Sequence, residues 1–178
     1  MSIQWDNSGP VKGRTWIDLV RPASGESVKL ICIGEQIEGL WLHWIDGKTI
    51  PCTGEDEGCP YHRGDREGEL RWKGYFAAVR AIGTPIVYGE VTEEAWKCSP
   101  LLVNLSQQRA LRGVRVTLFR KRGGPRRPVI VVMEHHDEVV GRADLLPKCP
   151  DVRRAVSVLW GAQPSTNGHQ HKKAESES

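Results

Sequence analysis

The segment from residue 46 to 68 constrains the fold more than any other part of this sequence. It is rich in Gly, Asp and Glu, and it separates an aromatic-rich segment at 40–45 from a longer segment at 69–82 that is expected to form a strand or a bent pair of strands. A loop of that length is uncommon inside a compact domain unless something organises it. Cys52, Cys59 and His62 lie in this segment, and His43 comes just before it. The sequence therefore points to a bound metal ion as the organising device.

The spacing of these residues, His43-x8-Cys52-x6-Cys59-x2-His62, is compatible with a zinc site. Zinc prefers four tetrahedral sulfur and nitrogen ligands, and a Cys-x2-His pair lets one tight turn supply two of them. With four protein ligands no coordination position is left for water, so we expect a structural zinc ion rather than a catalytic one. Two alternatives stay open: the four residues are unpaired thiols and surface histidines, or Cys98 replaces one of the histidines.

Apolar–polar alternation and frequent turn residues predict a chain made mainly of β-strands. The 19 glycines and 11 prolines imply many turns rather than long helices. The residues TEEAW predict a helix that begins at Thr92 and that Pro100 kinks or divides. A short amphipathic helix is expected over residues 150–159. Extended segments are expected at 15–21, 27–33, 40–45, 69–82, 86–91, 111–119 and 128–134.

This order of strands, then a helix, then two further strands is that of an OB fold, a five-stranded Greek-key barrel. We therefore expect a mainly β, OB-like domain over residues 14–160, with one helix between the third and fourth strands and a short C-terminal helix. The zinc loop, residues 43–62, is an insertion in this domain. Residues 1–13 are expected to be flexible and residues 161–178 to form a disordered tail. Another small barrel or an α+β sandwich would have the same order of elements.

Charge is distributed unevenly along the chain. The formal net charge is only +3, but residues 109–127 contain eight basic residues and no acidic one. A basic face of this kind is typical of proteins that contact nucleic acid, although a short basic run is also a common solvated surface. Five cysteines fit a secreted disulfide framework poorly, and the N-terminus has no signal-like apolar stretch, so we expect a cytoplasmic protein.

Aromatic and basic residues alternate in the strands that flank the loop. On OB folds, bases stack on such rings and phosphates meet such cations. We expect bases to stack on Trp41, Trp44, Trp72 and Tyr75. The expected phosphate contacts are Arg71, Lys73, Arg115, Arg120, Lys121, Arg122, Arg126 and Arg127.

Other apolar residues are expected in the core. Alternation over residues 112–119 directs Val114, Val116 and Leu118 inward, and Cys32 is expected to behave as a small apolar core residue. Tryptophan is itself usually a core residue, and Trp96 and Trp160 are the first candidates for burial. One apolar helix face is expected to contain Ala95, Trp96, Leu101, Leu102 and Leu105.

The ligand order of the loop, next to strands with surface aromatics, resembles that of the single-stranded DNA-binding proteins of T4-like phages. In that family one histidine and three cysteines hold a structural zinc ion beside the DNA cleft. The matching positions are His43, Cys52, Cys59 and His62, the last being cysteine in the family. The resemblance implies an OB fold, a role in phage DNA replication, and docking of a protein partner by the C-terminal tail. That tail is strongly acidic in the family, whereas HQHKKAESES has two glutamates and two lysines.

We therefore expect a non-catalytic protein that binds single-stranded DNA, or RNA, with little sequence preference. One alternative is a protein-interaction or virion-associated module, because exposed tryptophans also mark protein interfaces. The other is a metal-dependent nuclease or phosphoesterase that uses the cluster Glu134, His135, His136 and Asp137. Adjacent strand residues point to opposite faces, so both histidines cannot enter one site without a bulge. The sequence also has no phosphate loop, nucleophile elbow or HExxH motif.

Overall fold

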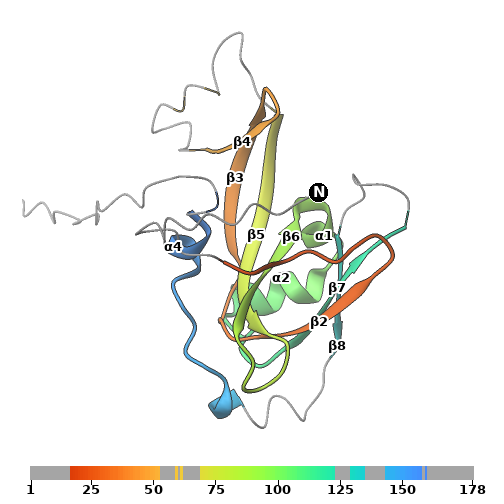
Figure 1. The fold of residues 1–178 in the computed structure, drawn as a ribbon, viewed down its shortest axis with the longest axis vertical. Helices are drawn as coiled ribbons and strands as arrows, with labels where there is room; N and C mark the ends of the chain where they lie inside the picture. The colour runs from red at the N-terminus through yellow and green to blue at the C-terminus, as the bar shows by residue number, and fades with distance from the viewer. Residues whose placement is uncertain are drawn as a thin grey trace, which may run out of the picture.

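The computed structural model describes residues 17–52, 59, 61, 69–122, 129–134, 143–157 and 159. The segments 1–13 and 161–178, predicted to be flexible and disordered, lie outside these residues. No helix in the described part is long and apolar enough to cross a membrane. In chain order the elements are β1(Leu19–Val20), β2(Ser27–Cys32), β3(Glu38–Ile45), β4(Lys48–Pro51), β5(Glu69–Val79), β6(Ile86–Thr92), α1(Glu93–Lys97), α2(Pro100–Gln107), β7(Arg115–Arg120), β8(Val129–Glu134), the 3-10 helix η1(Ala143–Leu145) and α4(Val152–Ser157) (Figure 1).

One mixed sheet of eight strands forms the framework of the described chain. Its order is β1-β6-β5-β2-β7-β8, with β3 paired to β5 and β4 paired to β3. All pairings are antiparallel except that of β1 with β6. The prediction of a mainly β fold is confirmed. The sheet has eight strands rather than the five of the expected barrel. Seven of them correspond to the seven extended segments that were expected, and β4 is an additional strand.

The long strand β5 connects the two parts of the sheet. Along one edge, residues 69–75 pair with β3, and Ala78 and Val79 pair with the end of β2. The other edge pairs with β6. β2 pairs with β7 over residues 27–31 and with β5 only at Ile31 and Cys32. Most of β2 therefore lies away from β5, whereas β3 lies alongside it.

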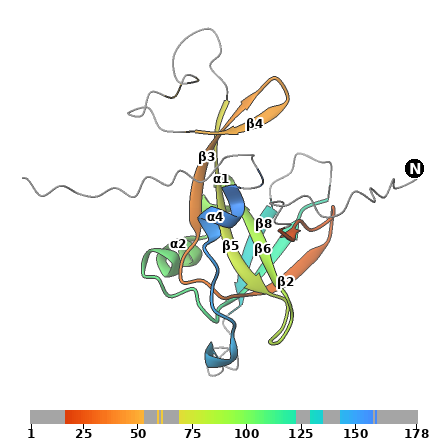
Figure 2. The same ribbon diagram turned by 60° about the vertical axis from the view of Figure 1, so that its left-hand side comes forward.

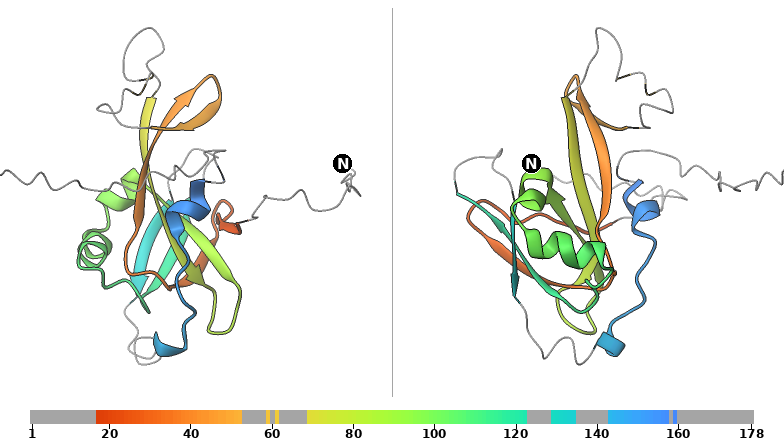
Figure 3. Two further views of the ribbon diagram at one scale, coloured as in Figure 1. Left: turned by 90° about the vertical axis from the view of Figure 1, so that its left-hand side faces the viewer. Right: turned by 180° about the vertical axis from the view of Figure 1, so that it is seen from behind.

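Alternate residues of β5 enter two separate apolar clusters. Phe76 and Ala78 belong to an inner cluster with residues from β2, β6, β7 and α2. Tyr75, Ala77 and Val79 belong to an outer cluster, which apolar residues in and before α4 close. Figure 3 shows α1 and α2 on one side of β5 and α4 on the other. The pleat of a single strand thus contributes to both cores.

The predicted helix is present but divided. Thr92 is the N-cap of α1, and its Oγ1 accepts a hydrogen bond from the backbone N–H of Ala95 at 3.3 Å. The chain leaves the helix at Cys98 and Ser99, and Pro100 then opens α2. The first turn of a helix suits proline, since its missing N–H would have no intrahelical partner there. Pro100 therefore separates two helices.

The predicted core positions among the described residues are confirmed with two corrections, and Trp160 lies outside those residues. Val114, Val116, Leu118 and Cys32 are all buried. On the helices Ala95 and Leu102 are buried, but Leu101 is 43% exposed, because it lies on the solvent side of α2. Trp96 is only half-buried and packs at the edge of the inner cluster.

A projecting arm consists of residues 41–52 and the first residues of β5, and Figure 1 shows it extending beyond the rest of the sheet. Asp46 and Gly47 form the turn between β3 and β4, with φ values of 48° and 76°. Positive φ at both central residues is required by the two-residue type I′ hairpin turn, for which Asp-Gly is a preferred pair. The prediction of a loop that begins at residue 46 is therefore wrong for residues 48–51, which form β4.

Candidate functional site

The register of β3 with β5 divides the side chains of the arm between two faces. Pairing is continuous from Glu38 opposite Tyr75 to Trp44 opposite Glu69, so the side chains alternate without a bulge. We call one side the metal face, which carries Trp41, His43, Leu70 and Trp72. We call the other side the outer face, which carries Trp44, Arg71, Lys73 and Tyr75.

His43 and Cys52 share the metal face because the ladder between β3 and β4 continues past the end of β4. The backbone N–H of Cys52 donates to the carbonyl oxygen of Trp41 at 2.8 Å, which places these two residues opposite each other. His43 pairs with Ile50, two positions before Cys52, so the pleat directs both ligand side chains to one face. His43 is buried and Cys52 is half-buried.

Cys59 brings a third ligand group to this position. Its Sγ lies 3.4 Å from Nε2 of His43, and the ligand atoms of His43, Cys52 and Cys59 all lie within 4.8 Å of one another. Cys59 is also buried. Thiolates and imidazole suit zinc and other borderline or soft metals. These three residues could therefore hold a metal ion.

The remaining ligand predictions have different outcomes. His62 lies outside the described residues. Cys98, the alternative ligand, is exposed at the C-terminal end of α1 and is not part of the metal cluster found among the described residues. Sequence reasoning missed Tyr61, whose ring centroid lies 5.6 Å from that of His43. Its position between Cys59 and His62 was the available signal.

The predicted stacking tryptophans do not share one surface. Trp41 and Trp44 are each 45% exposed, but the register places them on opposite faces of β3. Trp72 lies opposite Trp41 and is half-buried against Trp96, with ring centroids 5.2 Å apart. A Cβ added at Gly39 would lie 2.5 Å from Nε1 of Trp72, so this glycine makes room for the indole. Trp72 is thus largely a packing residue.

The burial of Tyr75 contradicts the prediction that it stacks bases. Only 1% of Tyr75 is exposed, because apolar residues in and before α4 cover this part of the outer face. Its hydroxyl donates to Oε2 of Glu90 at 3.4 Å. The sequence identified the aromatic ring but not the distant segment that packs over it.

Glu90 joins two basic side chains at the outer face. Its Oε1 lies 3.0 Å from Nζ of Lys73, and its Oε2 lies 3.3 Å from Nη2 of Arg21. The carboxylate is buried, whereas 55% of the Arg21 side chain is exposed. Sequence reasoning missed both Glu90 and Arg21. A single carboxylate inside an otherwise apolar strand, IVYGEVT, was the signal for Glu90.

One cation of the outer face contacts an exposed aromatic ring. The guanidinium carbon of Arg71 lies 5.8 Å from the ring centroid of Trp44, within the range of a cation–π interaction. Arg71 is itself exposed. The expected pairing of aromatic and basic residues is therefore present at this position of the arm.

The basic residues of β7 lie on the far side of β2 from β5. Arg115 and Arg120 are half-buried in the strand, and Lys121 and Arg122 are exposed after it. The side chain of Arg122 lies over Gly25, where an added Cβ would be 2.8 Å from Cγ of the arginine. Outside the described residues lie Arg126 and Arg127, and also His135, His136 and Asp137 of the alternative catalytic cluster.

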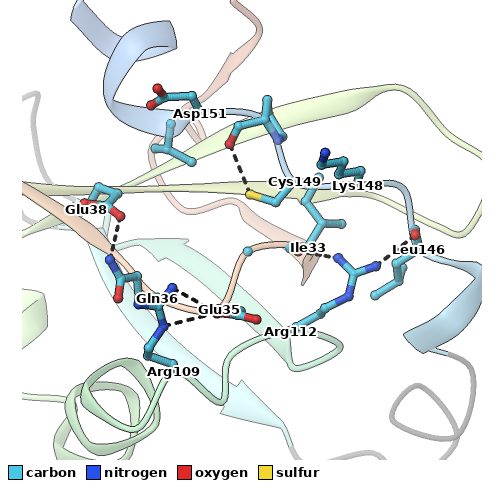
Figure 4. A pocket seen from close by; sticks show the side chains of 13 residues that line it. Ile33, Glu35, Gln36, Glu38, Arg109, Arg112, Leu146, Lys148, Cys149 and Asp151 are labelled. Carbon is cyan, nitrogen blue, oxygen red and sulfur yellow. Dashed lines mark hydrogen bonds and ion pairs between the residues drawn. The ribbon is translucent and has the colours of Figure 1, made fainter. Parts of the chain in front are cut away.

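A cavity of about 600 Å³ lies between the turn after β2, the turn after α2 and the segment before α4 (Figure 4). Arg112 donates hydrogen bonds to the carbonyl oxygens of Ile33 at 2.6 Å, Leu146 at 2.9 Å and Pro147 at 3.1 Å. Cys149 also lines the cavity, and burial raises the pKa of its thiol. The three carbonyl contacts make Arg112 a tether for the C-terminal segment.

The wider comparisons do not place the chain in a group of known proteins. Searches against family models, curated proteins and solved structures found no match. The function of this chain must therefore be inferred from the geometry of the arm and its surroundings.

Proposed function

We propose that this protein binds single-stranded nucleic acid without catalysing a reaction, and that a structural zinc ion stabilises the arm that makes the contact. The observation that carries this proposal is Trp44, which is 45% exposed on a projecting strand with the Arg71 guanidinium 5.8 Å from its ring. Bases stack on exposed aromatic rings regardless of sequence, each stack contributing roughly 1–3 kcal/mol, while nearby cations neutralise the phosphates. DNA is our first choice of ligand and RNA the alternative.

The strand connectivity supports an OB-type barrel. The chain of β2 and β3 pairs with both β5 and β7, the helices α1 and α2 fall between β6 and β7, and β6 contacts β8. In OB folds the loops after the first and fourth strands bind oligonucleotides. In the proposed barrel the first of these loops belongs to the arm, which also carries Trp44 and Arg71, and the second is the basic segment that follows β7.

The chemistry of the ligand set supports zinc. Two thiols and one imidazole converge in the described part of the arm, and the sequence offers His62 as the fourth ligand. Four protein ligands would leave no open position for a water nucleophile, which favours a structural role. The resemblance of this loop to that of the T4-like phage proteins is consistent with the same role.

A protein partner is the second candidate, and the metal face favours it. Trp41 is 45% exposed and Leu70 39% exposed on that face, so two large apolar side chains lie close to the cluster of His43, Cys52 and Cys59. Exposed apolar residues that lie together often mark protein interfaces. This surface could be occupied while the outer face binds nucleic acid.

The test is a fluorescence titration of the full chain, after its zinc content has been measured, with a short labelled oligothymidylate and with its duplex counterpart. We expect tighter binding to the single strand, quenching of tryptophan fluorescence, and affinity that falls steeply as salt rises because phosphate contacts release counterions. Absence of binding to either oligonucleotide at low salt would reject the nucleic-acid function and leave the protein partner as the leading candidate.

A further inference from the structure

We infer that the single strand runs along the outer face of β5, across Trp44, Arg71, Lys73 and Arg21, and that Glu90 is the residue that positions the two cations nearest to it. This inference rests on the proposed function. It adds a defined binding surface and assigns the contact with nucleic acid to one face of the arm. The metal face, with its equally exposed Trp41, is assigned no contact with nucleic acid.

The spacing of the cations on β5 supports this path. Arg71 and Lys73 are separated by one residue of β5, so the pleat places them on the same face roughly 6.6–6.8 Å apart along the strand. Trp44 lies next to Arg71 on the adjacent strand and continues this row toward the tip of the arm. An extended polyanion can contact such a row at successive phosphates, with a base stacked on the indole.

The charge balance around Glu90 also supports this path. One buried carboxylate binds both Lys73 and Arg21, at 3.0 Å and 3.3 Å. Tyr75 contacts the same carboxylate through its hydroxyl, at 3.4 Å. Two cations around a single anion leave a net positive charge at the surface, and the carboxylate holds both cations in fixed positions. Pre-positioned side chains lose less conformational entropy when a phosphate binds.

The position of α4 limits how far the path can follow β5. The elements around α4 cover Tyr75, Ala77 and Val79, so the row cannot continue along the lower part of β5. Figure 2 shows α4 lying in front of the lower part of the arm strands. Arg153 of α4 binds Glu38 of β3 at 2.6 Å, which fixes the helix beside the row. A nucleic-acid strand that runs along β5 from Trp44 must therefore turn toward Arg21. Glu90 binds both Lys73 and Arg21, so it connects the two cations.

These features fit an extended single strand better than a duplex. The contacts are one exposed ring and a row of cations along a single β-strand, and none of these residues offers an arrangement for reading base edges in a groove. A ring with an accessible face stacks any base, so little sequence preference is expected. The ligand class is therefore a single-stranded nucleic acid recognised through its backbone and one stacked base.

Matched variants on the two faces test the inference. Trp44→Ala is compared with Trp41→Ala, since both rings are 45% exposed on the same strand. Lys73→Gln is compared with Lys48→Gln, whose lysine is exposed on β4 and pairs with Ile45. We expect Trp44→Ala to weaken oligothymidylate binding at least about fivefold. Lys73→Gln should make the slope of log K against log salt concentration shallower by about 0.7, which is the value for one lost phosphate contact with a single strand. The metal-face variants should stay within about twofold of the unsubstituted protein.

Glu90→Gln separates positioning from simple charge. Removing a carboxylate makes the surface more positive, so a purely electrostatic effect would strengthen binding and steepen the salt dependence. If Glu90 positions Lys73 and Arg21, the variant binds more weakly and with a shallower salt slope. Circular dichroism and thermal melting identify any variant that is not folded, and the two tryptophan variants decide the path in that case.

The outcomes distinguish this inference from the proposed function. If the unsubstituted protein binds the single strand and Trp41→Ala or Lys48→Gln weakens binding more than Trp44→Ala and Lys73→Gln, the path on the outer face is wrong while the function stands. If Glu90→Gln binds more tightly, Glu90 has no positioning role. If the unsubstituted protein does not bind single strands at all, both proposals fail.

Discussion

The body of the sheet and the projecting arm are stabilised in different ways. In the body, residues such as Leu30, Phe76 and Val116 are almost completely buried in a continuous apolar cluster. In the arm, all four residues of β4 are exposed or half-buried. The buried residues of the segment 41–52 are Leu42 and His43, and Cys59 is buried beside His43. Burial of apolar surface stabilises the body by roughly 25 cal/mol per Å². The arm has less such surface, so we expect its order to depend on the proposed metal ion.

The largest expected effect comes from a cavity in the body. Phe76 packs directly over Gly89, where an added Cβ would lie 2.2 Å from Cζ of the ring. Replacing Phe76 with Ala should lower the free energy of unfolding by about 3–5 kcal/mol. Denaturant unfolding with and without a chelator measures this loss, which we expect to be equal in both conditions. Leu101→Ala, at an exposed position, is the control and should change stability by less than about 0.5 kcal/mol. A loss that depended on metal would contradict the separation of body and arm.

Removal of the metal should affect the arm alone. A metal present at a thousandfold excess over its dissociation constant stabilises the state that binds it by about 4 kcal/mol, and chelation removes that contribution. We expect hydrogen exchange to become fast at the amides of β3 and β4 in the arm and to stay slow in β2 and β7. Cys52→Ser should reproduce this pattern, and Cys98→Ser, outside the cluster, should not. Equal protection of the arm in the chelated and loaded protein would show that no metal is needed.

The thiols of the two regions should respond to pH in different ways. Burial raises the pKa of Cys32 in the body from 9.0 to about 12. The folded protein therefore keeps this proton at a pH where the unfolded chain has lost it. Stability from this group is fully present below pH 9.0 and is lost progressively as pH rises toward about 12. The expected loss at pH 10 is about 1 kcal/mol. The arm thiols, by contrast, must ionise to bind metal.

Unfolding measured between pH 8 and pH 11 in the presence of chelator tests this smaller effect. Cys32→Ala should have a flatter pH dependence than the unsubstituted protein, although its stability at neutral pH will be lower because a cavity forms. Alkylation provides a second measurement, since exposed Cys98 should react quickly and buried Cys32 only after global unfolding. Rapid alkylation of Cys32 in the folded protein would contradict its assignment to the core.

Local sequence patterns were sufficient to predict much of the fold and part of the site. Alternation predicted a strand over 27–33, and the structure has β2 at Ser27–Cys32. Thr92 followed by two glutamates predicted the start of α1, and the spacing of His43, Cys52 and Cys59 predicted residues that do converge. These features depend on interactions between residues near in sequence or in adjacent strands. The overlooked Asp46-Gly47 turn was also a local signal, and it would have predicted β4.

Only the tertiary structure decided which face of each strand is covered. An alternating strand has two faces, and the sequence of β5 does not show that elements around α4, more than sixty residues later, bury Tyr75 on one of them. The register of β3 against β5 separated Trp41 from Trp44, and the pairing of β6 with β5 brought Glu90 to Lys73. The sequence by itself determined most of the strands, the start of α1, the candidate metal ligands and the cations. The tertiary structure decided which of them meet, because burial and ion pairing depend on segments that only the folded chain brings together.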